Sequence, residues 1–398
     1  MQYDFDRHVD RKSTNDMKWH TAPVSAYLGC QVREDMIPMW LADTEFACPP
    51  VIVNALRDRV EKEIFGYCAP GPQFYKAIVW WLQRRFGWQV QPGWISMGPT
   101  VVAFINVAIR AFTQPGDGVI IQQPVYDPFA SIVQRAGRRV VNNALVNKSG
   151  RYEMDFDLLE QQAADPANKL LVLCSPHNPV GRVWTEAELR RLADICLAHD
   201  VLVVCDEIHS DMVFSGHTHT PLLALDERYA DAFIYLNAPG KSFNVAGLKV
   251  SYAVIPNAQR KKAFDAMQVA MSLDVRNTFG LEAVAAAYTP EGEEWMVQEV
   301  AYMEENAKRT EAYVNEKIPG AHLARPEGCF LCWLDLTGTG MSDADILKNI
   351  IVDGGVVCVP GPWFGKGGEG HLRLNIGCPW EMLETALERI AQAVKTRQ

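Results

Sequence analysis

The sequence has no long run of charge of one sign and no long apolar segment. Its 398 residues carry a net charge of -10, spread along the chain, so nucleic acid and anionic membranes are not expected as partners. No segment reaches the roughly 20 apolar residues that a membrane helix needs. The opening residues M-Q-Y-D-F-D-R-H are charged, and no apolar stretch follows them as it would in an export signal. We therefore expect a cytoplasmic protein.

The sequence also lacks the paired ligand spacing of a metal site. One C-x-x-C occurs among its ten cysteines, from Cys329 to Cys332, in an apolar segment that we interpret as a core strand. His217 and His219 lie in a loop with no third ligand nearby. We predict no metal site. Without an export signal, we expect the cysteines to be reduced and buried.

Strand and helix patterns alternate from residue 94 onward. The expected strands are 95–97, 119–122, 139–142, 170–174, 201–205, 233–236 and 250–255. They are apolar throughout instead of at every second residue, which is typical of strands covered by helices on both faces. We predict an α/β fold with a mostly parallel sheet, in which ligands bind at the carboxyl ends of the strands.

The pattern divides the chain into three parts. Residues 1–48 contain no long periodic segment and are expected to form an N-terminal arm and a segment of a small domain. Residues 49–288 are expected to form the large domain. Residues 289–398 are expected to form a smaller α/β domain that closes over a substrate. The helices and strands expected there are a long amphipathic helix at 291–318, strands at 329–336 and 356–359, and helices at 344–352 and 380–396.

Several polar residues directly follow expected strands. Lys241 comes after the segment 233–236 and a short Ala-Pro-Gly turn. Desolvation there would lower the pKa of the lysine and free a neutral amine to attack a carbonyl group. Tyr126, Asn178 and Asp206 follow three other strands. Taken singly, a turn, a helix cap or a solvated lysine explains each of these residues, but their shared place at one sheet edge favours a site.

These residue types match what pyridoxal 5'-phosphate (PLP) requires. The cofactor needs a lysine for its aldehyde, a carboxylate for its ring nitrogen, a flat aromatic ring and a phosphate cup. Lys241, Asp206, Tyr126 and the turn at 98–101 fit these four needs, because a helix start offers free N-H groups to phosphate. Arg373 is suited to bind a substrate α-carboxylate through two hydrogen bonds.

Eight motifs in fixed order carry a family resemblance over nearly the whole chain. They are N-D-M-K-W (15–19), P-M-W-L-A-D (38–43), F-G-Y (65–67), P-V-Y-D-P-F (124–129), P-H-N-P-V-G-R-V-W (176–184), D-E-I-H-S-D (206–211), P-G-K-S-F-N-V-A-G-L (239–248) and L-R-L-N-I-G-C-P (372–379). The chain resembles the fold-type I PLP-dependent aminotransferase superfamily. D-E-I-H narrows the resemblance to the cystathionine β-lyase or carbon-sulfur lyase subgroup.

The resemblance implies a role for each matching residue. Lys241 would form the internal aldimine and later move protons, Asp206 would pair with the pyridine nitrogen, and Tyr126 would stack on the ring. The other cofactor contacts would be Asn178 at the ring O3' oxygen, His209 where aminotransferases usually carry a tyrosine, Thr100 and Val101 at the phosphate, and Tyr67 at the phosphate of the neighbouring subunit. A site shared between subunits implies a homodimer.

The same resemblance places Arg373 at the substrate carboxylate and assigns Ala42 and Trp363 to substrate binding. The segment 360–364, with Trp40, either forms an apolar wall near the leaving group or packs the domain interface. Both interpretations stay open at this point.

Two departures from the family pattern concern the phosphate cup. Relatives commonly carry a serine directly before the lysine and often another three residues before it, where this chain has Gly240 and Ala238. The usual arginine after the lysine is also missing, and Lys249 is a candidate to take its place. We therefore expect weaker cofactor binding than in relatives with these serines.

The resemblance implies a carbon-sulfur β-lyase that cleaves L-cystathionine or related S-substituted L-cysteines to a thiol, pyruvate and ammonia by α,β-elimination. An aminotransferase on the same scaffold is the alternative, and a need for a 2-oxo acid acceptor would distinguish it. A lyase with a second role as a regulatory binding protein is a further alternative. Intact Lys241, Asp206 and Arg373 argue against a protein without catalytic activity.

Overall fold

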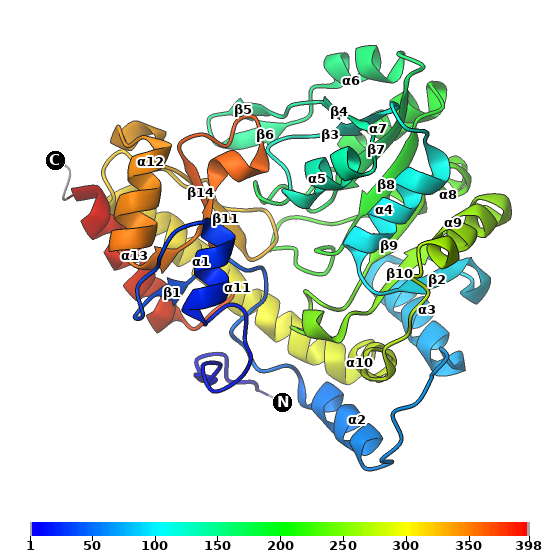
Figure 1. The fold of residues 1–398 in the computed structure, drawn as a ribbon, viewed down its shortest axis with the longest axis horizontal. Coiled ribbons are helices and arrows are strands. Elements are labelled where there is room, and N and C mark those ends of the chain that lie inside the picture. Colours follow the sequence, from blue (N-terminus) through cyan, green and yellow to red (C-terminus); the bar gives the residue numbers. More distant parts are fainter. Residues whose placement is uncertain (1, 396–398) are drawn as a thin grey trace.

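The fold is that of a computed structural model, which describes residues 2–395. Its main feature is a central sheet of seven strands, counted over those residues (Figure 1). In spatial order they are β2 (Ile95–Gly98), β10 (Ser251–Val254), β9 (Ile234–Asn237), β8 (Leu202–Asp206), β7 (Asn168–Cys174), β3 (Gly118–Ile121) and β4 (Arg139–Asn142). The strands from β9 to β4 are parallel, and β10 is antiparallel to both neighbours. The prediction of a mostly parallel sheet is confirmed.

Consecutive residues of β7 show that the sheet is buried on both faces. Leu170 and Val172 belong to one apolar core, together with helices α4 (Val101–Phe112), α5 (Pro128–Arg135) and α9 (Ala258–Ala270). Leu171 and Leu173 belong to a second core, together with α3 (Pro72–Phe86), α6 (Phe156–Ala163), α7 (Glu186–Ala198) and α10 (Thr278–Ala287). Because helices cover both faces, the strands are apolar at every position.

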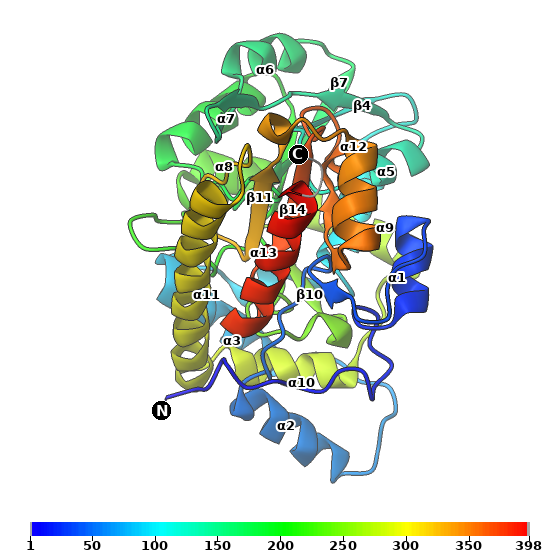
Figure 2. The same ribbon diagram turned by 90° about the vertical axis from the view of Figure 1, so that its left-hand side faces the viewer.

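A smaller antiparallel sheet follows in the C-terminal part of the chain. It consists of β11 (Leu331–Asp335), β14 (His371–Asn375) and β13 (Val359–Pro360), in that order. Helices α11 (Pro290–Lys317) and α13 (Trp380–Lys395) run side by side next to it (Figure 2). The N-terminal segment joins this part, since β1 (Ile37–Pro38) pairs in parallel with β12 (Val356–Val357). The division into three parts at residues 48 and 288 stays a prediction.

The remaining elements connect these layers. They are α1 (Thr21–Leu28), α2 (Pro50–Val60), the hairpin of β5 (Val146–Lys148) and β6 (Arg151–Glu153), α8 (Glu227–Ala232), α12 (Asp343–Ile346) and short 3-10 turns.

Some predicted elements differ from the observed ones. The helix expected at 344–352 is the short α12 followed by a π-helical segment, Leu347–Asp353. The strand expected at 356–359 is divided into β12 and β13. Helices α9 and α10 were not predicted, and their burial explains why. Most of α10 is buried, whereas α9 buries only Phe264 and Gln268, so neither has a clear apolar stripe on one side.

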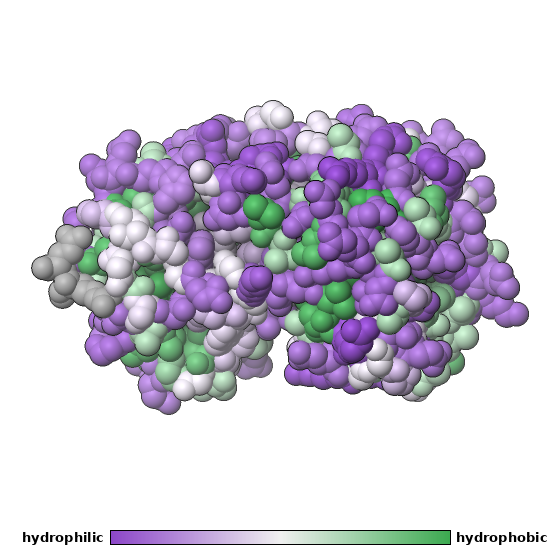
Figure 3. Space-filling model, turned by 90° about the horizontal axis from the view of Figure 1, so that it is seen from above, coloured by the Kyte–Doolittle hydropathy of each residue, from purple (hydrophilic) through white to green (hydrophobic). Residues whose placement is uncertain are grey.

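The outer surface is mostly hydrophilic on the face seen in Figure 3, where the hydrophobic patches are small and a notch separates two lobes. None of the helices in residues 2–395 is long and apolar enough to cross a membrane. In the same residues, no group of three or more His, Cys, Asp or Glu side chains is arranged to hold a metal ion.

Candidate active site

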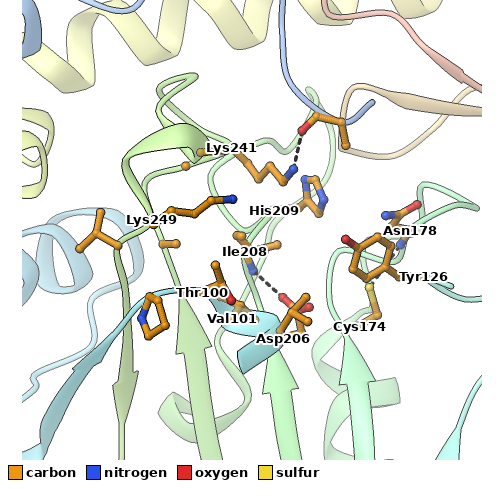
Figure 4. Close-up of a pocket in the computed structure, with 17 residues that line it drawn as sticks. Thr100, Val101, Tyr126, Cys174, Asn178, Asp206, Ile208, His209, Lys241 and Lys249 are labelled. Carbon is orange, nitrogen blue, oxygen red and sulfur yellow. Dashed lines mark hydrogen bonds between the residues drawn. The ribbon is translucent and has the colours of Figure 1, made fainter. Parts of the chain in front are cut away.

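A cavity of about 350 Å³ lies at the carboxyl ends of β7, β8 and β9 (Figure 4). The sequence predicts that a ligand binds at this edge of the sheet. The predicted site residues that line it are Ala42, Thr100, Val101, Tyr126, Asn178, Asp206, His209 and Lys241. The volume is that of a small-molecule or cofactor site.

Lys241 reaches the cavity from a short turn after β9. Its amine donates a hydrogen bond to the carbonyl oxygen of Ala42, the dashed line that begins at Lys241 in Figure 4. Desolvation lowers the pKa of Lys241 to about 8, an effect that Asp43 opposes and Arg373 strengthens. A sizeable fraction of this amine is therefore neutral near pH 7 to 8, which is the form that attacks a carbonyl group.

Asp206 is the last residue of β8, and it is 5% exposed. Among the described residues, the hydrogen-bond donor to its carboxylate is the Ile208 N-H at 3.2 Å, which is neutral. Burial raises the pKa of Asp206 to about 7. A buried carboxyl group without a cationic hydrogen-bond donor fits a ligand that brings its own positive charge, such as a protonated pyridine nitrogen.

The start of α4 forms another part of the cavity. The Thr100 hydroxyl caps this helix by accepting the Ala103 N-H at 3.1 Å. The N-H groups of Val101 and Val102 open the helix and so have no partner within it. Lys249 lies on the same side of the cavity in Figure 4. Free amides, the positive end of a helix dipole and a lysine together fit a phosphate group.

Ala238 and Gly240 also line the cavity, so the two positions at which relatives commonly carry serine provide no hydroxyl group. A Cβ atom at Gly240 would lie 3.2 Å from the Cα atom of Ala246, which is tight packing. Ala238 already carries a Cβ atom and is 4% exposed. The two positions therefore differ in how easily they accept a larger side chain.

Tyr126 and Asn178 lie on the side of the cavity away from Lys249 (Figure 4). Burial raises the pKa of Tyr126 to about 12, so the phenol is neutral, and its ring packs edge-on against Phe129 with centroids 5.8 Å apart. The Asn178 backbone N-H donates to Cys174 Sγ at 3.4 Å. A neutral aromatic ring and an amide can stack on, and hydrogen-bond to, a flat ligand.

Arg373 approaches the site from the smaller sheet, where it pairs with Trp333. It is 5% exposed, and it donates from Nη1 to Asn178 Oδ1 at 3.3 Å and from Nη2 to the Trp40 carbonyl oxygen at 2.6 Å. Its Nε is buried and lacks a hydrogen-bond partner within residues 2–395. Because an unpaired buried donor costs about 1–3 kcal/mol, this group fits a ligand that supplies an acceptor, such as a carboxylate.

Trp40 and Trp363 both contact Tyr27, a residue that the sequence analysis did not single out. Trp40 is 1% exposed and packs beneath Tyr27 of α1, with ring centroids 4.5 Å apart. Tyr27 also meets the Trp363 ring at 4.9 Å and is itself 39% exposed. Trp40 is therefore interior, while the two interpretations of the segment 360–364, a wall near the leaving group and packing of the domain interface, both stay predictions. Tyr27 could not be recognised from the sequence, because α1 has only eight residues and no apolar stripe.

Tyr67 does not reach the cavity of its own chain. Its side chain is fully exposed, and Ile64 and Phe65 beside it are exposed as well. The Phe65 ring packs against Phe279, with centroids 5.7 Å apart. The segment before α3 thus presents several apolar side chains to solvent.

The cysteines of the C-x-x-C segment and the histidines His217 and His219 were considered as metal ligands in the sequence, and they lie in different parts of the structure. Cys332 lies in β11, but Cys329 precedes the strand and lies 3.3 Å from His209, measured from Sγ to Nδ1. The expected core strand is therefore confirmed, but it begins at Leu331, two residues after Cys329. His219 Nε2 lies 2.6 Å from Glu207 Oε2, in an interior pair directly after β8.

The chain is similar to proteins of one family over nearly its whole length. Residues 39–390 match the family described as aminotransferase class I and II. The chain is 39% identical to cystathionine beta-lyase PatB of Bacillus subtilis (strain 168), over 98% of this chain and 99% of the relative. A PLP-bound putative aminotransferase from Clostridium difficile 630 has a TM-score of 0.95 at 37% identity, over 99% and 100% of the two chains. Cystalysin from Treponema denticola, whose structure contains a PLP cofactor, has a TM-score of 0.95 at 32% identity, over 100% of both chains.

Proposed function

The chain belongs to the aminotransferase class I and II family, and we propose that it is a PLP-dependent carbon-sulfur β-lyase. Its fold is the fold-type I fold of PLP-dependent transferases. The proposed substrates are L-cystathionine and related S-substituted L-cysteines. The observation that carries the proposal is the placement of Lys241 and Asp206 in one cavity, with Arg373 hydrogen-bonded to Asn178 in its wall.

The residues present fit the cofactor. Asp206 offers a buried carboxyl group for the ring nitrogen, Tyr126 offers its ring face, and the first amides of α4 with Lys249 offer a phosphate site. When bound, PLP supplies an aldehyde for amino groups and a protonated ring that accepts the electron pair released at the substrate α-carbon. Lys241 is the amine suited to react with this aldehyde, because burial lowers its pKa and favours the neutral form.

The proposed elimination breaks the Cα-H and Cβ-S bonds of the amino acid. Arg373 binds the α-carboxylate, and this fixes the orientation of the α-carbon. The neutral amine of Lys241 takes the α-proton, and the sulfur leaves the β-carbon with the electron pair of the C-S bond. The sulfur gains a proton and becomes a thiol. With one water molecule, the remaining carbon skeleton gives pyruvate and ammonia.

The assembly that we propose is a homodimer in the cytoplasm. A fully exposed tyrosine beside exposed Ile64 and Phe65 is unusual for a surface that faces solvent alone, and a second copy of the chain would cover it. Tyr67 would then reach the phosphate in the neighbouring subunit. Ten unpaired cysteines, all within the described residues, favour a reducing compartment.

A steady-state assay with L-cystathionine and no 2-oxo acid tests the proposed reaction. Equal release of pyruvate and free thiol is the expected result. The opposite result is no pyruvate from cystathionine, cystine or S-alkyl cysteines, with turnover only when 2-oxoglutarate or pyruvate is added. That outcome would assign the protein to the aminotransferases of the same family, because transamination requires an acceptor and elimination does not.

A further inference from the structure

The side chains of His209 and Cys329 meet beside the cavity. Cys329 Sγ lies 3.3 Å from His209 Nδ1, within hydrogen-bond distance for sulfur. Cys329 is fully buried and His209 is 3% exposed, while the Phe330 ring packs edge-on against the imidazole with centroids 5.8 Å apart. His209 also lines the cavity, close to Lys241 in Figure 4. One ring nitrogen is therefore held by a thiol inside the protein.

The backbone keeps the thiol in this place. The Cys329 N-H donates to the Met212 carbonyl oxygen at 2.7 Å, and the Met212 N-H donates to the His209 carbonyl oxygen at 3.0 Å. Cys329 has a φ of 72°, a left-handed conformation that a non-glycine residue seldom adopts. These bonds connect the segment before β11 to the turn after β8, so the Sγ-Nδ1 contact is built into the fold.

The protons of the pair can be assigned from the surroundings. Burial raises the pKa of the Cys329 thiol to about 12, so the sulfur keeps its proton. Burial, with smaller contributions from the positive charges of Lys241 and Arg373, lowers the pKa of His209 to about 3, so the imidazole is neutral. A neutral imidazole has one N-H donor and one acceptor nitrogen. If the thiol donates its hydrogen to Nδ1, the imidazole proton is on Nε2.

We propose that Cys329 is a positioning residue that holds His209 in the tautomer with the proton on Nε2, so that the imidazole offers an N-H donor to the occupant of the cavity. The choice of occupant rests on the proposed function: PLP and an amino acid carry ring, phosphate and carboxylate oxygens, which are hydrogen-bond acceptors. A bare Nε2 would present a lone pair to these oxygens. Histidines that bind metals are held in the same way: one ring nitrogen binds the metal, and a hydrogen bond at the other ring nitrogen selects the tautomer.

The position of Cys329 connects this donor to substrate binding. Cys329 lies two residues before β11, and Trp333 of β11 pairs with Arg373 of β14. The segment that sets the imidazole proton therefore continues directly into the strand that supports the proposed carboxylate site.

Two substitutions separate the hydrogen bond from the presence of a side chain. Serine at position 329 can donate to Nδ1 as the thiol does, whereas alanine cannot.

The test is a 15N spectrum of the full-length protein labelled at histidine, recorded with PLP bound and again after PLP is removed. The chain has nine histidines, and the signals lost in His209→Asn identify those of His209. We expect the Nε2-H tautomer in the natural protein and in Cys329→Ser. In Cys329→Ala we expect loss of this single tautomer, with lyase kcat/KM lowered about five- to tenfold, as for one lost hydrogen bond.

Cys332→Ala is the matched control, because Cys332 is equally buried in the same segment and has no hydrogen bond to His209 among the described residues. It should leave the His209 signals unchanged. An Nδ1-H tautomer in the natural protein, or an unchanged tautomer in Cys329→Ala, would overturn the proposal. The spectra need no turnover. An inactive protein with the expected tautomers would therefore contradict the proposed lyase function and leave the role of Cys329 intact.

Discussion

Arg373 Nη1 donates a hydrogen bond to Asn178 Oδ1 at 3.3 Å, so the proposed carboxylate-binding residue lies against a residue of the proposed cofactor site. The two residues come from different sheets, since Arg373 lies on β14 and Asn178 follows β7. This contact links the smaller sheet to the edge of the large one. Arg373 Nε is buried and has no hydrogen-bond partner among residues 2–395.

The first prediction concerns this arginine. Arg373→Lys removes the planar fork but keeps the charge, so we expect kcat/KM for cystathionine to fall about 10- to 100-fold, as for a lost hydrogen bond to a charged group. Most of the loss should appear in KM, because the carboxylate is bound in the ground state as well as in the transition state. Steady-state kinetics would measure it. Arg84→Lys, at a more exposed ion pair with Glu293, is the control and should be near neutral. Equal kinetics for both variants would exclude Arg373 from substrate binding.

The second prediction concerns the missing hydroxyl groups of the phosphate site. Ala238→Ser adds a donor in the cavity without adding a Cβ atom, so we expect the Kd for PLP to fall about five- to tenfold. Gly240→Ser should gain less, because its Cβ atom would press on the Cα atom of Ala246 at 3.2 Å. Titration of the cofactor-free protein with PLP measures both values. If Ala238→Ser binds PLP no more tightly than the natural protein, the missing hydroxyl does not limit cofactor affinity.

The third prediction is a pH dependence of stability. The pKa of Asp206 is about 7 in the folded protein and ordinarily 3.8, so between these values the folded state binds more protons than the unfolded state. The free energy of unfolding contributed by this residue is therefore largest below pH 4. It falls as the pH rises to 7, by on the order of 4 kcal/mol in the cofactor-free protein.

Asp206→Asn removes this titration and provides the comparison. Melting of the cofactor-free proteins should show the natural protein losing stability relative to the variant between pH 4 and 7. Bound PLP should reduce the difference, because the pyridine nitrogen then supplies the positive charge. If the melting temperatures of the two proteins change in parallel between pH 4 and 7, ionisation of the buried Asp206 carboxyl group does not destabilise the fold.

The sequence predicted the position of a site residue correctly where that residue directly follows an apolar strand. Lys241, Asp206 and Asn178 each follow an apolar run, and in a parallel sheet such ends meet at one edge, so three local patterns were sufficient to bring these residues together. The antiparallel direction of β10 could not be predicted in this way, because an apolar strand reads the same in either direction.

Contacts between distant parts of the chain were beyond the sequence. His209 and Cys329 are 120 residues apart. Their contact involves a left-handed backbone at Cys329, and a cysteine in the sequence does not predict that conformation. Tyr27 packs against Trp363, more than 300 residues away in the sequence, with ring centroids 4.9 Å apart. Neither arrangement leaves a periodic signal, since both depend on tertiary packing.

The last prediction tests whether the active site is shared between two chains. Lys241 lines the cavity of its own chain, whereas Tyr67 is fully exposed and does not line that cavity. Lys241→Ala and Tyr67→Ala should each be strongly impaired alone. In a hybrid dimer of the two variants, one site combines an intact Lys241 with an intact Tyr67, and the other site lacks both. Mixed and reassembled variants should therefore recover up to about a quarter of the natural activity, because about half of the dimers are hybrids with one complete site each. Native mass spectrometry would establish that hybrids form, because the hybrid and the two homodimers differ in mass. Hybrids that form without recovering activity would place Tyr67 outside the partner's site and leave the exposed apolar segment at 64–67 without a catalytic role.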